Sequence, residues 1–236
     1  MRVAEGPTHM TVPDTFDAYA NGREDARFTD WLRERSEPDW SAAVDGRFVR
    51  ELGAGEVDPD VFRRYLEQDY AFVATLTGTF GHALGEAPSM AAKGRFADFL
   101  GTLTDEENDY FERSFDALDA DPDASRAPTT RAFVDLLERA GRQGGYAETL
   151  AVLVPAEWVY ETWATSVSEP IPEPFYLGEW VELHANPAFV DFVDWLRTEL
   201  DREGAAASAD RQRRLDDLFR RTVELERAFF ESTYES

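Results

Sequence analysis

The sequence predicts an all-α protein, a single-domain bundle of about eight to ten helices. Apolar residues recur at helical spacing along most of the 236 residues, and no alternating stretch bounded by turn residues indicates a strand. With 43% hydrophobic and 13% aromatic residues, the chain is able to bury a sizeable core. We therefore expect one helical domain over residues 14–236, preceded by a flexible polar tail over residues 1–13.

Residues that favour turns divide the chain into helical segments. A weak pattern near the N-terminus breaks at Gly22, Pro59 is typical of the first turn of a helix, and residues 141–145 are rich in glycine. Thr104 and Glu107 have the spacing of a capping box, with Thr104 as the N-cap. This spacing predicts that one helix ends before Thr104 and another begins after it. The expected helices cover residues 16–34, 40–52, 61–84, 91–103, 105–118, 129–140, 146–167, 175–184, 187–203 and 210–234.

Each of these segments has apolar residues on one side. Trp40, Val44, Phe48 and Leu52 lie four positions apart and predict one continuous helix over residues 40–52. The two longest segments show the same spacing, with candidate core residues Val61, Phe62, Tyr65, Leu66, Phe80, Leu215, Phe219, Val223 and Phe230.

The segment over residues 150–163 is the most apolar and is expected to form a central helix. Pro155 lies within it, and a proline there removes one backbone donor and favours a kink. Beyond the proline, Ala156 and Tyr160 fall on one side, with Glu157 on an adjacent side. From spacing alone, this arrangement is either the wall of a pocket or an ordinary packed helix whose glutamates reach solvent.

The charge of the chain limits its partners. A net charge of −24 argues against binding to nucleic acids or to anionic membranes. Lys93 is the single lysine, and almost every basic residue is arginine. Acidic surplus, scarce lysine and absent cysteine together resemble proteins of salt-adapted archaea, whose charge repulsion is screened by molar salt. No signal peptide or membrane-spanning segment is evident, so a cytoplasmic location is expected.

The same inventory limits the chemistry. Without cysteine, the chain has no thiolate nucleophile and no thiolate metal site. The three histidines, His9, His82 and His184, have no Glu-x-x-His partner, so neither a metal centre nor a cofactor is expected. Asp69 and Glu226 are unusual because apolar residues surround both. Such carboxyls either face solvent or are buried with perturbed pKa values that suit acid–base work.

Four stretches together resemble the TenA family, also called thiaminase II, which has the haem-oxygenase-like fold. They are FRRYLEQDYAF at residues 62–72, LVPAEWVY at 153–160, FYLGEW at 175–180, and ERAFF at 226–230 followed by Tyr234. The likeness extends over most of the chain. The family hydrolyses thiamin or its aminopyrimidine breakdown products and releases hydroxymethylpyrimidine for thiamin salvage. The resemblance therefore implies a small-molecule aminopyrimidine as the partner and a homo-oligomer, either a tetramer or a dimer.

The resemblance also implies a role for individual residues. Asp69 matches the aspartate that binds the amino group and ring nitrogen of the pyrimidine. Glu226 matches the catalytic glutamate, and Tyr160 a tyrosine one turn after the usual nucleophile. The remaining matches line the substrate site, with Phe133 and Phe229 stacking on the ring; they are Phe72, Phe133, Ala156, His184 and Phe229.

One departure from the family pattern changes the expected chemistry. Ala156 stands where the thiaminase branch has its nucleophilic cysteine, which excludes covalent attack by a thiolate. The chain resembles a cysteine-lacking branch that is associated with hydrolysis of aminopyrimidines and formyl-aminopyrimidines. Glu226 or Glu157 is then the expected general base, with Tyr160 assisting. Two alternatives stay open: a pyrimidine-binding or regulatory protein without activity, and an oxidase-type enzyme on the same fold.

Overall fold

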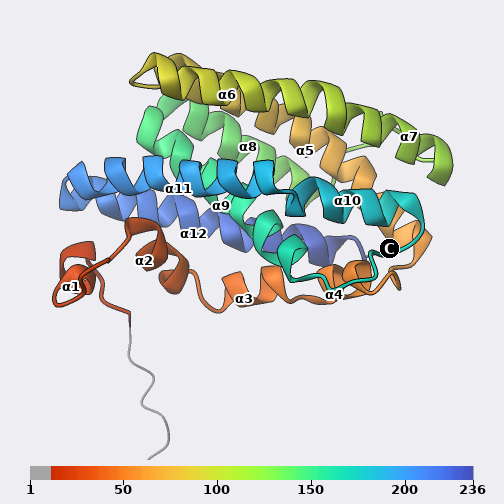
Figure 1. Ribbon diagram of the computed structural model, residues 1–236, viewed down its shortest axis with the longest axis horizontal. Helices are drawn as coiled ribbons and strands as arrows, with labels where there is room; N and C mark the ends of the chain where they lie inside the picture. The colour runs from red at the N-terminus through yellow and green to blue at the C-terminus, as the bar shows by residue number, and fades with distance from the viewer. Residues whose placement is uncertain (1–11, 236) are drawn as a thin grey trace, which may run out of the picture.

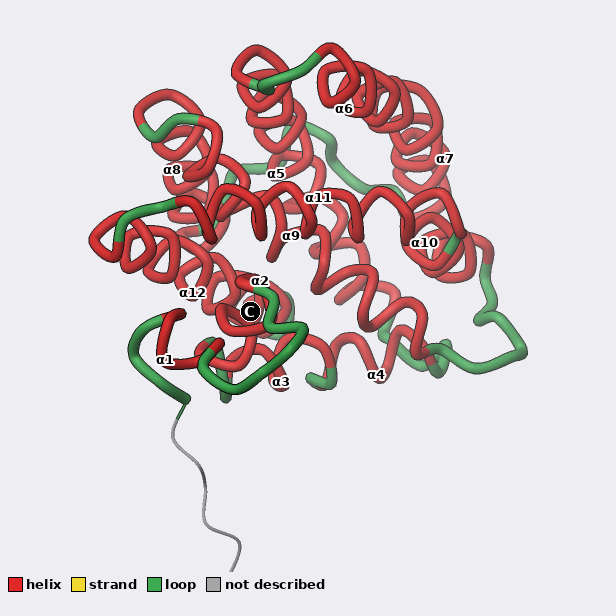
Figure 2. Tube along the Cα trace, turned by 60° about the vertical axis from the view of Figure 1, so that its left-hand side comes forward, coloured by secondary structure: helices red, strands yellow, loops and turns green. Residues whose placement is uncertain are grey.

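The computed structural model describes residues 12–235, and the all-α prediction is confirmed over that range (Figures 1 and 2). It has no strand there, and its helices are more numerous than expected because the N-terminal ones are short. They are α1 (Phe16–Ala20), α2 (Phe28–Arg35), α3 (Asp39–Val44), α4 (Arg47–Gly53), α5 (Pro59–Glu86), α6 (Met90–Thr102), the π-helical segment η1 (Leu103–Glu107), α7 (Asn108–Leu118), α8 (Pro128–Gln143), α9 (Tyr146–Ser166), α10 (Phe175–Ala185), α11 (Pro187–Ala206) and α12 (Ala209–Ser232).

Helix α9 is the centre of the bundle, as the sequence predicts. It packs against α5, α8, α10, α11 and α12, and in Figure 1 it lies behind α11. Every residue from Tyr146 to Tyr160 is buried, because apolar side chains predominate around this stretch and gain from burial on several sides. The helix continues through Pro155.

The single helix predicted over residues 40–52 is wrong. The chain leaves the helical conformation at Asp45 and Gly46, which separates α3 from α4. The break lets the two halves turn their aromatic rings toward different neighbours. Trp40 packs on Trp158 with ring centroids 4.7 Å apart, whereas Phe48 stacks on Phe230 at 5.3 Å. Tertiary packing therefore overrides the regular spacing of the apolar residues.

The predicted break at Thr104 is also wrong. Helices α6 and α7 are joined without a loop by η1, as the continuous ribbon in Figure 1 shows. The Thr104 hydroxyl donates to the carbonyls of Leu100 and Gly101 inside the helix and caps nothing. Within η1, Leu103 and Glu107 are buried. A π-helical turn of this kind often occurs at functional sites.

The predicted break over residues 204–209 is shorter in the structure, because α11 continues to Ala206. Gly204 lies inside that helix against Phe28, and a β-carbon at this position would overlap the phenyl ring. Glycine therefore allows α11 to approach α2 closely.

Most of the predicted tail, residues 1–11 with His9, lies outside the described residues. Pro13, at the end of that tail, accepts a hydrogen bond from the Trp31 indole at 2.9 Å. Within residues 12–235, no helix is both long enough and apolar enough to cross a membrane.

Candidate active site

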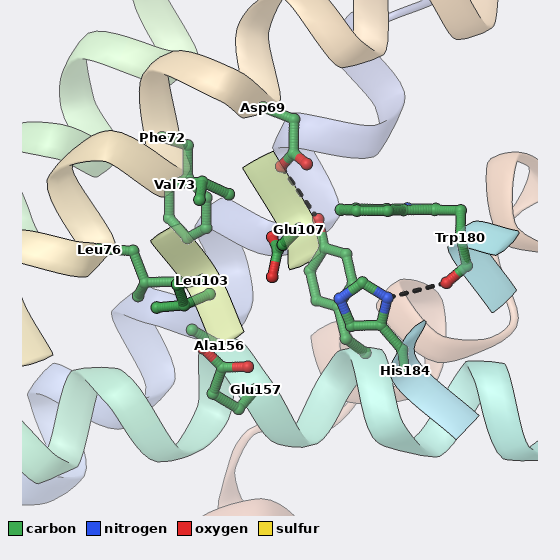
Figure 3. Close-up of a pocket in the computed structure, with 11 residues that line it drawn as sticks. Asp69, Phe72, Val73, Leu76, Leu103, Glu107, Ala156, Glu157, Trp180 and His184 are labelled. Carbon is green, nitrogen blue, oxygen red and sulfur yellow. Dashed lines mark hydrogen bonds between the residues drawn. The ribbon is translucent and has the colours of Figure 1, made fainter. Parts of the chain in front are cut away.

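A small cavity lies between α5, η1, α9 and α10 (Figure 3). The side chains that line it are Asp69, Phe72, Val73, Leu76, Leu103, Glu107, Ala156, Glu157, Tyr160, Trp180 and His184. The cavity volume is about 20 Å³, which is room for about one water molecule. A planar ring is larger than that, so its binding requires some of these side chains to move.

Asp69 is the polar centre of the α5 wall. Its side chain is 1% exposed, and the Tyr160 hydroxyl donates to its Oδ1 at 3.4 Å. The Tyr160 oxygen is in turn 2.8 Å from the Tyr65 hydroxyl. Oδ2 of Asp69 has no hydrogen-bond partner among residues 12–235. Burial raises the pKa of Asp69 to about 7, although the phenols of Tyr65 and Tyr160 favour the charged form.

Helix α9 contributes Ala156 and Glu157 to the opposite wall. Glu157 faces the cavity and not the solvent, which resolves the alternative that the sequence left open. Its side chain is 5% exposed, and its Oε1 has no hydrogen-bond partner in the part of the chain that the structure describes. Burial, with the nearby charge of Asp69, raises the pKa of Glu157 to about 8. Ala156 has no nucleophilic group, and it lines the same cavity as the buried carboxyls of Asp69 and Glu157.

Glu107 is a cavity residue that the sequence analysis missed as a functional group. It is 8% exposed, and burial raises its pKa well above the usual range, with further contributions from Glu157 and Asp69. A signal was present, because Glu107 continues the apolar spacing of Phe96, Phe99 and Leu103. We interpreted it as a capping residue, and η1 instead turns it into the protein interior.

Glu226 and Phe229 of α12 are buried but do not line the cavity itself. Neither carboxyl oxygen of Glu226 has a hydrogen-bond partner within the described residues. Burial raises its pKa well above the usual range, and the charges of Asp69 and Glu157 add to that effect. The predicted catalytic glutamate is therefore part of the same electrostatic cluster as the cavity carboxyls.

The predicted stacking residues form one aromatic cluster. Phe72 lines the cavity, and its ring centroid is 4.5 Å from that of Phe133 and 6.1 Å from that of Phe229. Phe133 and Phe229 lie behind Phe72 and outside the cavity lining. Of the predicted site residues, six line the cavity and three adjoin it: Asp69, Phe72, Ala156, Glu157, Tyr160 and His184, then Phe133, Glu226 and Phe229.

His184 of α10 closes one end of the cavity. Its Nδ1 lies 2.9 Å from the Trp180 carbonyl, which only accepts, so Nδ1 holds a proton (Figure 3). Burial lowers the pKa of His184 to about 4, although the bond to Trp180 favours the charged form. The imidazole is therefore neutral at pH 7, with Nε2 as an acceptor.

A second, larger cavity adjoins the first and shares Glu107 and His184 with it. The volume of this second cavity is about 370 Å³, and it lies between α6, α10 and α11. Glu107 and His184 therefore lie where the two cavities adjoin. Among the described residues, no group of three or more His, Cys, Asp or Glu side chains is arranged to hold a metal ion.

Comparison with known proteins gives consistent results. The profile of the TENA/THI-4/PQQC family matches residues 33–236. An aminopyrimidine aminohydrolase of Halalkalibacterium halodurans is 27% identical and covers 86% of this chain and 93% of its own length. An aminopyrimidine aminohydrolase of Helicobacter pylori is 23% identical, with 87% of this chain and 98% of its own length covered.

Solved structures confirm the haem-oxygenase-like helical fold. A TenA homologue of P. horikoshii matches with a TM-score of 0.78 and 20% identity, over 89% of this chain and 99% of its own. A TenA homologue of Pyrococcus furiosus matches with a TM-score of 0.80 and 19% identity, over 88% of this chain and 100% of its own.

Proposed function

Because the chain belongs to the TENA/THI-4/PQQC family, we propose that it is a hydrolase of thiamin-derived aminopyrimidines. The reaction converts the aminomethyl or formylaminomethyl pyrimidine to hydroxymethylpyrimidine, which serves thiamin salvage. The observation behind this proposal is the small cavity that Asp69, Glu107 and Glu157 line together beside Tyr160. The names of the two bacterial relatives support the same reaction.

Asp69 orients the aminopyrimidine in this proposal. With a pKa near 7, its carboxyl group is protonated in a large part of the molecules at neutral pH. A protonated carboxyl donates to a ring nitrogen and accepts from the neighbouring exocyclic amino group, which matches the edge of an aminopyrimidine. Phe72 lines the cavity beside Asp69, with Phe133 and Phe229 behind it, and this aromatic cluster supports the ring.

A carboxylate activates water in place of the missing thiol. Glu226 or Glu157 takes a proton from water and then passes it to the leaving amine, and Tyr160 stabilises the developing charge. A raised pKa suits a group that both accepts and donates a proton near neutral pH. Glu107 is a third carboxyl within the same cavity. Ala156 and the absence of cysteine place the chain, in this proposal, in the cysteine-lacking branch.

The test is a direct assay of the purified protein in concentrated salt. Thiamin, the aminomethyl pyrimidine and its N-formyl form are incubated separately, and hydroxymethylpyrimidine, ammonia and formate are measured. We expect turnover of an aminopyrimidine but not of thiamin. Asp69→Asn and Glu226→Gln are expected to lose about 10²–10⁴-fold in rate. Glu182→Gln, which changes an exposed glutamate on α10, is the matched control.

Two outcomes contradict the proposal. Wild-type rates in both Asp69→Asn and Glu226→Gln exclude the assigned carboxyl roles. Tight pyrimidine binding without turnover instead indicates a binding or regulatory protein on the fold of an enzyme. Circular dichroism and thermal unfolding of each variant separate lost activity from lost folding.

We also propose the setting in which the enzyme works. The acidic surplus and the single lysine support a halophilic archaeal origin and a salt-rich cytoplasm. Residues 14–236 form one TenA-like domain in this proposal, and the protein works as a homodimer or homotetramer. Light scattering in concentrated KCl measures the oligomeric state, and a monomer contradicts that part.

A further inference from the structure

Four carboxyl groups gather in the interior, and no basic side chain among residues 12–235 compensates them. Asp69, Glu107, Glu157 and Glu226 are each no more than 8% exposed. Unpartnered carboxyl oxygens remain on Asp69, Glu157 and Glu226. Within the described residues, none of the four has an arginine or lysine among the groups that influence its charge.

We propose that this cavity binds its substrate as a cation, an aminopyrimidine whose methylene carries a protonated primary amine. Neutral derivatives of the same size bind more weakly. The inference rests on the proposed hydrolysis of aminopyrimidines and narrows its substrate class. A buried ammonium group needs a nearby counter-charge, and a cluster of buried carboxyls supplies one when a single carboxyl releases its proton.

The titratable groups around the four carboxyls favour the release of one carboxyl proton when an ammonium group binds. From the elements packed around it, they are Tyr65 and Asp69 on α5, Glu107 on η1, Tyr110 on α7, Glu157 and Tyr160 on α9, His184 on α10 and Glu226 on α12. Burial raises the pKa values of these carboxyls and phenols, which favours their protonated forms while no cation is present. His184 is neutral because burial lowers its pKa, and it therefore contributes no positive charge.

The adjoining larger cavity has the same sign of charge. Asp98, Glu106 and Asp191 line it together with one arginine, Arg95. Arg95 is already paired with Asp191 at 2.8 Å. A cation that approaches Glu107 through this cavity is therefore attracted along the way.

A protonated amine also suits the reaction. The methylene C–N bond breaks with its electron pair on nitrogen, so the group leaves as ammonia. Water forms the new C–O bond and gives a proton to the ionised carboxylate, and that proton passes to ammonia to give ammonium. The overall reaction, R–CH₂–NH₃⁺ + H₂O → R–CH₂–OH + NH₄⁺, exchanges no proton with the solvent.

Because the overall reaction exchanges no proton with the solvent, any proton that is released on mixing reports substrate binding and not turnover. The protein is mixed rapidly, at pH 7 in weak buffer with a pH indicator, with the 5-aminomethyl pyrimidine or with its neutral 5-ethyl isostere. We expect about one more proton per site to be released with the amine. We also expect the amine to bind at least about tenfold more tightly than the ethyl compound, a difference equivalent to about one pKa unit.

Variants identify the groups responsible. Glu107→Gln removes one carboxyl from the cluster and should reduce both the proton release and the preference for the amine. Glu182→Gln, on the exposed side of α10, should change neither. Equal proton release and equal affinity for the two compounds overturn the inference even if the enzyme is active. A preference for the amine without turnover supports the inference and contradicts the proposed hydrolysis alone.

Discussion

Replacing Glu157 with glutamine is expected to stabilise the protein at pH 8 and to leave its stability at pH 4.5 nearly unchanged. Burial raises the pKa of Glu157 from 4.5 to about 8. Between these two values the folded protein holds a proton that the unfolded chain has already released. Rising pH therefore favours the unfolded chain, and this contribution to stability is lost between pH 4.5 and pH 8.

The size of the effect follows from the same shift. Raising the pKa of Glu157 from 4.5 to about 8 corresponds to about 5 kcal/mol of stability, at 1.36 kcal/mol for each tenfold change in proton affinity. Glutamine has a similar shape and does not ionise, so the variant avoids this loss. For a chain of this length, about 5 kcal/mol corresponds to an increase in Tm of about 10 °C or more.

The assay is urea unfolding of the wild type and Glu157→Gln in concentrated KCl, at intervals from pH 4.5 to pH 8.5. Glu182→Gln, which changes an exposed carboxyl, controls for the general loss of one negative charge. The difference in unfolding free energy between variant and wild type should grow with pH and level off above pH 8. Parallel curves for the two proteins would refute a buried position for Glu157.

Three further predictions concern packing, the site and the surface. Gly204→Ala should destabilise the protein by about 1–3 kcal/mol, because its β-carbon would overlap Phe28, whereas Gly94→Ala, with open space at its β-carbon, should be neutral or stabilising in the same unfolding experiment. Tyr160→Phe removes the hydrogen bond to Asp69 and should raise the pKa of that carboxyl further, so the alkaline limb of the pH–rate profile, where the protonated Asp69 is lost, should move to higher pH; an unchanged profile contradicts the assigned contact. The Tm should rise steeply from low to high KCl because salt screens the net charge of −24, and a Tm independent of salt excludes halophilic adaptation.

The sequence by itself determined the helical class and most helix positions. Apolar spacing and capping residues act within one or two turns, so Pro59 marks the start of α5 and the apolar run around Pro155 forms the buried helix α9. Composition also fixed the charge and excluded a thiol mechanism, because Ala156 stands in a chain without cysteine. These properties need no knowledge of tertiary contacts.

Only the tertiary structure decided which carboxyls share the cavity. The helical spacing of α9 is compatible with Glu157 facing either solvent or the interior. The packing of the neighbouring helices places it in the cavity lining. From the sequence, Glu107 resembles a capping residue, whereas η1 places it in the protein interior. The break at Gly46 follows from the different packing partners of Trp40 and Phe48. Side chains on α5, η1 and α9 meet at the cavity because of how the helices pack, and contacts between residues so distant in sequence leave no local pattern.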